Sequence, residues 1–383
     1  MKRFLGFVSA VAIALVGVTG GCSSSRGPSN AGGGGRPATG APNIQLRLPT
    51  PQRDPLGYDL AAAPLNGVAG GEVGALAPVP GSAAATLAGH APLNQVAAVV
   101  SLTAVTEGGF PFAVADLASV GTLAFAATGD PAVAGAGDVW RRVELAAGRP
   151  TWSLVLDTGA SQAALGVLGS GELLVAVGGP GQPASLLLLD PATSAIVDSR
   201  ALGASFSPRT VVEFPAGSGA VWVGGAGAVG APAVLIQVSA GQAIPVTLPS
   251  PGPAAGGRQE LAALIRAPAD GGGELLALAV ADYDAAGAPL QGAFLISDGS
   301  AFSGVGGLSG DAPTRLAYLD GLQAGTALGR LVFQDAAGAF QDEPGFPAVE
   351  RVTSLLARDR KTLLVGCRSL GGARLVVRTG KSP

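Results

Sequence analysis

A pair of short apolar segments joined by a turn recurs six times along this chain. The first segments begin at residues 110, 162, 210, 261, 314 and 352, so most steps are close to 50 residues. The second segment usually opens with glycine, as in 121–128 (GTLAFAAT), 171–177 (GELLVAV) and 273–280 (GELLALAV). Apolar runs of this length between Gly, Pro and Asp turns are typical of β-strands. Because no stretch keeps the apolar spacing of a helix, the sequence predicts an all-β fold.

The repeat also predicts how the strands are arranged. A third segment follows in most units, for example 186–190 (LLLLD) and 234–236 (VLI), and several units offer a fourth. A period near 50 residues with up to four strands is typical of a β-propeller, whose sheets pack radially and cover each other's faces. We therefore expect about six four-stranded blades. Seven blades are one alternative, because the fifth unit is irregular, and a pair of β-sandwiches is another.

One apolar segment stands outside the six units. Residues 96–103 (VAAVVSLT) precede the first unit, whereas the last unit has three strand-like segments. We expect this spare strand to complete the last blade and so to close the ring.

The string 186–197 (LLLLDPATSAIV) resembles a hairpin that is common in bacterial surface and quinoprotein-like propellers. This resemblance implies a propeller fold. The tryptophan pattern of the quinoprotein type is absent, so no quinone site is carried over.

The N-terminus has the pattern of an export signal. Met1-Lys2-Arg3 is followed by an uncharged apolar run that ends in 19–25 (TGGCSSS). Small residues before a cysteine resemble the lipobox of bacterial lipoproteins, although Thr19 stands where that family usually has an aliphatic residue. The resemblance implies cleavage before Cys22, acylation of Cys22 and, because Ser23 follows, the outer membrane of a Gram-negative cell. A secreted or periplasmic protein is the alternative.

Four segments follow from these patterns. We expect a lipoprotein signal peptide at 1–21, and a lipidated cysteine with a flexible Gly/Ser/Pro tether at 22–42. Residues 43–95 keep no sustained period and are expected to form an irregular segment before the main domain. The propeller-like domain is expected at 96–383.

The string 156–161 (LDTGAS) resembles the catalytic turn of aspartic proteases. The resemblance implies that Asp157 would share a water molecule with a second aspartate. No second Asp-Thr/Ser-Gly string is present in the chain. Since Asp, Thr, Gly and Ser also favour turns, a turn between two blades is the competing interpretation, and Asp157 is the one catalytic candidate.

Other catalytic and metal chemistry is poorly represented. His90 is the single histidine, and Cys367, in the apolar run 363–367 (LLVGC), is expected to be a buried thiol. The formal charge is −3, or −5 once Lys2 and Arg3 are removed, which differs from the basic charge of nucleic-acid binders. We expect no cofactor, no metal site and no nucleic-acid partner.

These observations predict a lipoprotein held on the membrane through Cys22, in which the repeat domain acts as a binding or scaffolding module for envelope proteins. An envelope hydrolase, such as an aspartic protease using Asp157, is one alternative. A structural surface protein without a specific ligand is another.

Overall fold

The computed structural model describes residues 43–44, 58–64, 71–78, 95–102, 112, 114–120, 123–144, 150–269, 272–357, 362–368 and 373–379. The chain divides into two units, Met1–Gly40 and Ala41–Pro383, and all described residues lie in the second. Cys22, the tether and His90 lie outside the described residues. So do residues 110, 111 and 113 of the predicted strand 110–117.

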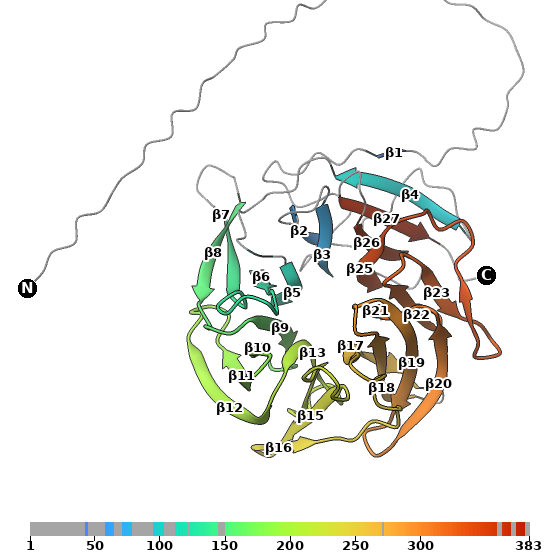
Figure 1. Cartoon of the computed structure of the whole chain (residues 1–383). Helices are drawn as coiled ribbons and strands as arrows, with labels where there is room; N and C mark the ends of the chain where they lie inside the picture. The colour runs from blue at the N-terminus through green and yellow to red at the C-terminus, as the bar shows by residue number, and fades with distance from the viewer. Residues whose placement is uncertain are drawn as a thin grey trace, which may run out of the picture. The chain divides into compact units, whose positions relative to one another are not determined.

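Within the described ranges the chain consists of β-strands and turns, without a helix (Figure 1). No helix of this part is therefore long and apolar enough to cross a membrane. The all-β prediction is confirmed, and five runs of four consecutive strands pair antiparallel, in four sheets.

Three sheets have four strands in chain order: β5 (Val114–Val120), β6 (Leu123–Thr128), β7 (Val139–Glu144) and β8 (Pro150–Leu156); β9 (Gln162–Val167), β10 (Leu173–Gly179), β11 (Gln182–Leu189) and β12 (Ile196–Ser205); β21 (Pro313–Tyr318), β22 (Leu322–Thr326), β23 (Leu331–Gln334) and β24 (Phe340–Asp342).

Two more runs of four strands have the same order: β13 (Ser207–Glu213), β14 (Val221–Ala226), β15 (Val234–Ser239) and β16 (Gln242–Pro245); β17 (Arg258–Pro268), β18 (Glu274–Tyr283), β19 (Pro289–Ser297) and β20 (Phe302–Ser309). The two runs are joined by the pairing of Ala226 in β14 with Glu260 in β17. This contact makes them one eight-stranded sheet.

The last sheet combines strands from both ends of the described chain. β25 (Arg351–Ala357), β26 (Thr362–Arg368) and β27 (Ala373–Thr379) are consecutive, and β4 (Gln95–Leu102) pairs antiparallel with β27, with Val99 opposite Val376. β1 (Asn43–Ile44) adds to β4 in parallel. The spare strand predicted at 96–103 therefore lies beside the last strand of the last unit.

β2 (Tyr58–Pro64) and β3 (Gly71–Pro78) form an antiparallel pair within the segment expected to be irregular. The predicted domain boundaries stay a prediction. The pair nevertheless places regular backbone in residues 43–95, where the sequence keeps no sustained apolar period.

The fifth unit is where the strand assignment fails. The segment 329–334, expected as a second strand, contributes the third strand, β23, and the second strand is β22. Its sequence, LQAGT, lacks an apolar run, yet all five residues are buried. Gln323 is fully buried there and its side chain donates to the Leu319 carbonyl.

Burial follows the order of strands within each sheet. All residues of β10 and β14 are buried, whereas β12 is exposed along most of its length. The apolar clusters lie between neighbouring sheets; one joins Phe125 and Val139 to Leu173 and Val175. The second strands are thus covered on both faces, which explains why their sequences are apolar at successive positions.

The first strands of successive sheets contact one another: β5 with β9, β9 with β13, β13 with β17, β17 with β21, and β21 with β25. β3 contacts both β25 and β5 (Figure 1). Side chains on the first strands therefore meet although they are far apart in the sequence.

Candidate functional site

The predicted catalytic turn lies between β8 and β9. Asp157 is exposed, and its Oδ1 accepts a hydrogen bond from the Gly159 N–H at 3.1 Å. The Thr158 hydroxyl donates to the Gly137 carbonyl and accepts from the Ala160 N–H at 3.0 Å. These bonds are those of a turn stabilised by Asp and Thr side chains.

A second carboxyl group lies near Asp157, although not in the string that the protease resemblance implies. Asp138 precedes β7, is buried, and has an Oδ1 atom without a hydrogen-bond partner. Burial and then the charge of Asp157 raise the pKa of Asp138, against the Thr158 N–H, which lowers it. The sequence gives no sign of this neighbour, because Asp138 is not part of an Asp-Thr/Ser-Gly string.

Cys367 and Trp222 lie in the core of their sheets. Cys367 is fully buried in β26, with its Sγ 3.7 Å from the Val365 carbonyl. Trp222 is buried in β14, where its indole N–H donates to the Phe214 carbonyl at 3.2 Å. Among the described residues, no group of three or more His, Cys, Asp and Glu side chains is placed to hold a metal ion.

The densest set of charges lies on the first strands. Four arginines come from four successive first strands, together with two carboxylates and a tyrosine that interact with them. We call the following seven residues the inner arginine cluster: Arg209 (β13), Arg258 and Glu260 (β17), Arg315 (β21), Arg351 (β25), Asp116 (β5) and Tyr283 (β18).

A recurring irregularity in the strand pairing sets the direction of several of these side chains. In five of the six first strands from β5 to β25, the pairing with the second strand skips one residue near the beginning of the strand, as in a β-bulge. Arg209 is the skipped residue of β13, and Asp116 and Arg315 each follow the skipped residue of their strand. Bulges redirect side chains and are frequent next to functional sites.

Glu260 is the centre of one half of the cluster. Its carboxylate lies 3.6 Å from Arg209 and 3.7 Å from Arg258, and its side chain is 6% exposed. Burial alone would raise the pKa of Glu260, but the charges of Arg209, Arg258 and Arg351 together hold that pKa below its usual value. Glu260 is therefore ionised at neutral pH.

Tyr283 packs beside this carboxylate. The Arg258 guanidinium lies 4.8 Å from the centre of the Tyr283 ring, a cation–π geometry. Burial and the charge of Glu260 raise the pKa of the Tyr283 hydroxyl well above its usual range. The phenol is therefore neutral at physiological pH.

Asp116 and Arg315 form the other half. Arg315 donates to the carbonyls of Ala115 and Thr314, both at 3.0 Å, which ties β21 to β5. Asp116 accepts from the Leu165 N–H of β9 and from the Leu117 N–H, both at 2.9 Å. Three different sheets thus meet at this carboxyl and guanidinium.

The environment of Asp116 makes it titrate near neutral pH. Burial raises its pKa to about 6, although the Leu165 N–H, Arg315 and the Leu117 N–H each lower it. Burial also lowers the pKa of Arg315, whereas the negative charge of Asp116 raises it.

Asp116 should make stability depend on pH. Its folded pKa lies above the ordinary value of 3.8, so the folded chain holds this proton more tightly and is destabilised as pH rises to about 6. Compared with Asp116→Asn, the wild type should gain about 2–3 kcal/mol of unfolding free energy between pH 7 and pH 4. Urea unfolding at several pH values measures the difference. The assignment would be contradicted if the difference in unfolding free energy between the wild type and Asp116→Asn were the same at pH 4 and pH 7. It would also be contradicted if the exposed Asp320→Asn, compared with the wild type, gave the same dependence on pH.

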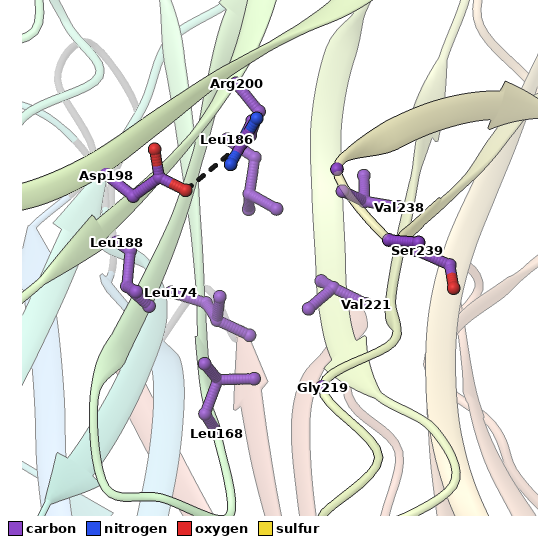
Figure 2. A pocket seen from close by; sticks show the side chains of 12 residues that line it. Leu168, Leu174, Leu186, Leu188, Asp198, Arg200, Gly219, Val221, Val238 and Ser239 are labelled. Atoms are coloured by element: carbon purple, nitrogen blue, oxygen red, sulfur yellow. Dashed lines mark hydrogen bonds and ion pairs between the residues drawn. The ribbon is translucent and has the colours of Figure 1, made fainter.

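Two of the pockets lined by described residues lie between neighbouring runs of strands. One, of about 150 Å³, separates the sheet of β9–β12 from β14 and β15 (Figure 2). Leu174, Leu186 and Leu188 face Val221 and Val238 across it, and the ion pair of Asp198 with Arg200 lies at one side.

The other pocket, of about 400 Å³, includes Trp222 and Phe302, whose rings meet edge to face at 6.1 Å between centroids. Neither pocket contains a residue of the inner arginine cluster.

Comparisons with known proteins assign no family. No family model matches the sequence, and no curated protein matches it. Solved structures that are similar include Raptor from Chaetomium thermophilum (9% identity, TM-score 0.47) and the Dos1 propeller (14%, 0.41). Another is Sqt1 from Chaetomium thermophilum bound to the N-terminus of ribosomal protein L10 (13%, 0.40).

These structures are matched over 71%, 70% and 85% of this chain, and over 24%, 79% and 79% of their own chains, respectively. This chain therefore spans about a quarter of the length of Raptor.

Proposed function

We propose that this chain is a lipoprotein of the cell envelope whose folded part is a β-propeller that binds a partner protein through the inner arginine cluster. No family relationship supplies this function. The proposal therefore rests on the N-terminal sequence, on the contacts between sheets and on the chemistry of the cluster.

The contacts between first strands support a propeller with seven blades. The sequence predicts about six, from the units that begin at 110 to 352. The pair β2–β3 adds a seventh group of strands, because β3 contacts both the first strand of the first unit and that of the last. Pairing of β4 with β27 then fastens the last blade by joining strands from opposite ends of the domain.

The N-terminal string supports anchoring through Cys22. One buried acyl chain binds a membrane only marginally, whereas more than one gives stable anchoring. Residues 23–42 are rich in Gly, Ser and Pro, a composition typical of linkers, and in this proposal they join the anchor to the folded domain. The outer membrane of a Gram-negative cell is the proposed location.

The inner arginine cluster is the observation that carries the binding function. It concentrates four guanidinium groups beside two carboxylates, in a chain whose formal net charge is −3. The planar guanidinium group of arginine forms paired hydrogen bonds with carboxylate and phosphate groups, and arginine is enriched in protein interfaces. A partner that presents an acidic group would complement this surplus of positive charge.

In-cell crosslinking of the tagged lipoprotein tests the function. We expect a small, reproducible set of envelope proteins with the wild type, and loss of that set with Arg209→Gln/Arg351→Gln. Cys22→Ala should leave the membrane fraction, whereas Cys367→Ala should stay in it. No enrichment over the signal peptide and tether alone would overturn the binding function and favour a structural surface protein.

An envelope hydrolase is the second candidate, favoured by one observation. Burial and the charge of Asp157 raise the pKa of Asp138, an arrangement that favours the protonated form of one of two carboxyl groups. Such a pair is the chemistry that the Asp-Thr-Gly resemblance implies. Peptidase activity at acid pH that disappears in both Asp157→Ala and Asp138→Asn would favour this candidate over the binding module.

A further inference from the structure

We propose that the inner arginine cluster binds a doubly charged oxyanion of the phosphate-monoester type. This inference rests on the proposed binding function and names the group that the partner would present. It is carried by the charge balance of the cluster, by the incomplete hydrogen bonding of its arginines, and by the way four strands bring those arginines together.

The inner arginine cluster carries a surplus of positive charge. Guanidinium groups stay charged at any physiological pH, so the cluster carries four positive charges. Asp116 and Glu260 are its two negative charges, and Tyr283 stays neutral. The surplus at pH 7 is therefore two positive charges.

The second step is the incomplete pairing of the arginines. Charge-assisted hydrogen bonds to carboxylates are about 2.7–2.9 Å long, whereas Arg209 and Arg258 lie 3.6 and 3.7 Å from Glu260. The buried Nε atoms of both arginines have no hydrogen-bond partner. Arg351 makes no ion pair within 4.0 Å among the residues that the structure describes.

The third step is convergence. Arg209, Arg258 and Arg351 all act on the carboxylate of Glu260, and Arg209 and Arg351 act on Arg315. The four arginines come from β13, β17, β21 and β25, and the positive charges of Arg209 and Arg351 lower the pKa of Arg315. Arg315 is fixed by two backbone carbonyls, so an incoming anion would find one guanidinium already oriented.

The charge surplus selects the class of anion. A phosphate monoester carries about −1.5 to −2 charges at pH 7 and three acceptor oxygens, which several arginines can share. One monocarboxylate would neutralise half of the surplus. The cluster should therefore prefer phosphate to acetate, and a compact dicarboxylate such as succinate should lie between them.

Calorimetric titration of the full mature lipoprotein in detergent tests this order. Inorganic phosphate, succinate and acetate are compared at equal ionic strength, with thermal unfolding as a second readout. We expect one phosphate site, and a loss of at least about tenfold in affinity, or about 1.4 kcal/mol, with Arg351→Gln. Because Arg351 makes no ion pair within 4.0 Å among the described residues, this variant should keep the fold, and its thermal unfolding is compared with that of the wild type.

The matched control is Arg200→Gln/Arg266→Gln, which removes two exposed arginines outside the cluster, paired with Asp198 and Glu274. It should bind phosphate as the wild type does. No phosphate binding, equal affinity for acetate, or equal loss in the control would overturn the inference.

Two results separate this inference from the proposed function. Captured partners without phosphate binding would overturn the anion class and leave the binding function standing. Phosphate binding without a captured partner would support the anion site and overturn the protein-binding function.

Discussion

Arg378→Met should lower the free energy of unfolding by about 3–5 kcal/mol, because it leaves one charge of a buried ion pair without its partner. Arg378 Nε donates to Glu343 Oε1 at 2.7 Å, and both side chains are 0% exposed. Burial raises the pKa of Glu343, against the hydrogen bond and the charge of Arg378. Without the guanidinium, Glu343 must either be buried as an uncompensated anion or take up a proton.

This ion pair lies between two sheets, so its loss should lower the stability of the whole domain. Arg378 lies in β27, and Glu343 follows β24, with its backbone N–H donating to the Leu331 carbonyl of β23 at 2.8 Å. The pair thus joins two sheets. Chemical denaturation should show a lower midpoint with an unchanged slope, since the surface exposed on unfolding stays the same.

A double variant and a surface pair make this prediction specific. Arg378→Met/Glu343→Leu should recover most of the loss, because the Arg378 Nη atoms also lack hydrogen-bond partners and an apolar pair removes that cost. Arg368→Met breaks the partly exposed pair with Glu350 and should cost less than about 1 kcal/mol. Equal losses for Arg378→Met and Arg368→Met would contradict the burial argument.

The fold was predictable where strands are apolar. The segments predicted at 162–168 and 261–267 contribute β9 and β17, and the fully buried β10 overlaps the predicted 171–177. β22 was missed because Leu322, Thr326 and the residues between them contain no apolar run, and packing between two other strands buries them. Tertiary packing, which sequence periodicity does not reveal, determines that these residues form a strand.

The candidate site was not predictable from local strings. Its arginines lie between residues 209 and 351 and come together only because first strands contact one another. One signal was present: a charged residue stands near the start of several otherwise apolar first strands, as in 207–210 (SPRT), 258–260 (RQE) and 313–315 (PTR). Charges at equivalent places in a repeat predict that they converge once the repeats pack around one centre.

The pairing of β4 with β27 predicts that a disulfide can join the two ends of the domain. Val99 and Val376 are direct partners in an antiparallel ladder, where Cα atoms lie about 4.5–5.5 Å apart, within the range that a disulfide spans. Val99→Cys/Val376→Cys should form a disulfide under oxidising conditions and stabilise the domain by about 2–5 kcal/mol, because the bond closes a very long loop. Thermal unfolding with and without reductant measures the gain.

The register supplies the control. Arg374 lies opposite Ser101, so Val99→Cys/Arg374→Cys places two thiols diagonally, about 7–8 Å apart at Cα, where a bond needs backbone movement. This variant should stay reduced and unfold like the wild type. Equal oxidation of both variants would mean that β4 slides along β27 and does not hold one register.

Deleting residues 96–103 tests the same contact from the opposite side. β27 would then present an unpaired edge, and an exposed edge strand pairs with other chains. We expect aggregation, or loss of cooperative unfolding, whereas a β4 that is only an appendage would leave thermal unfolding unchanged. If the disulfide stabilises the domain and the deletion abolishes folding, the pairing of β4 with β27 holds the two ends of the domain together. Ring closure through this pairing would then keep the arginines of β13 to β25 close to a common centre.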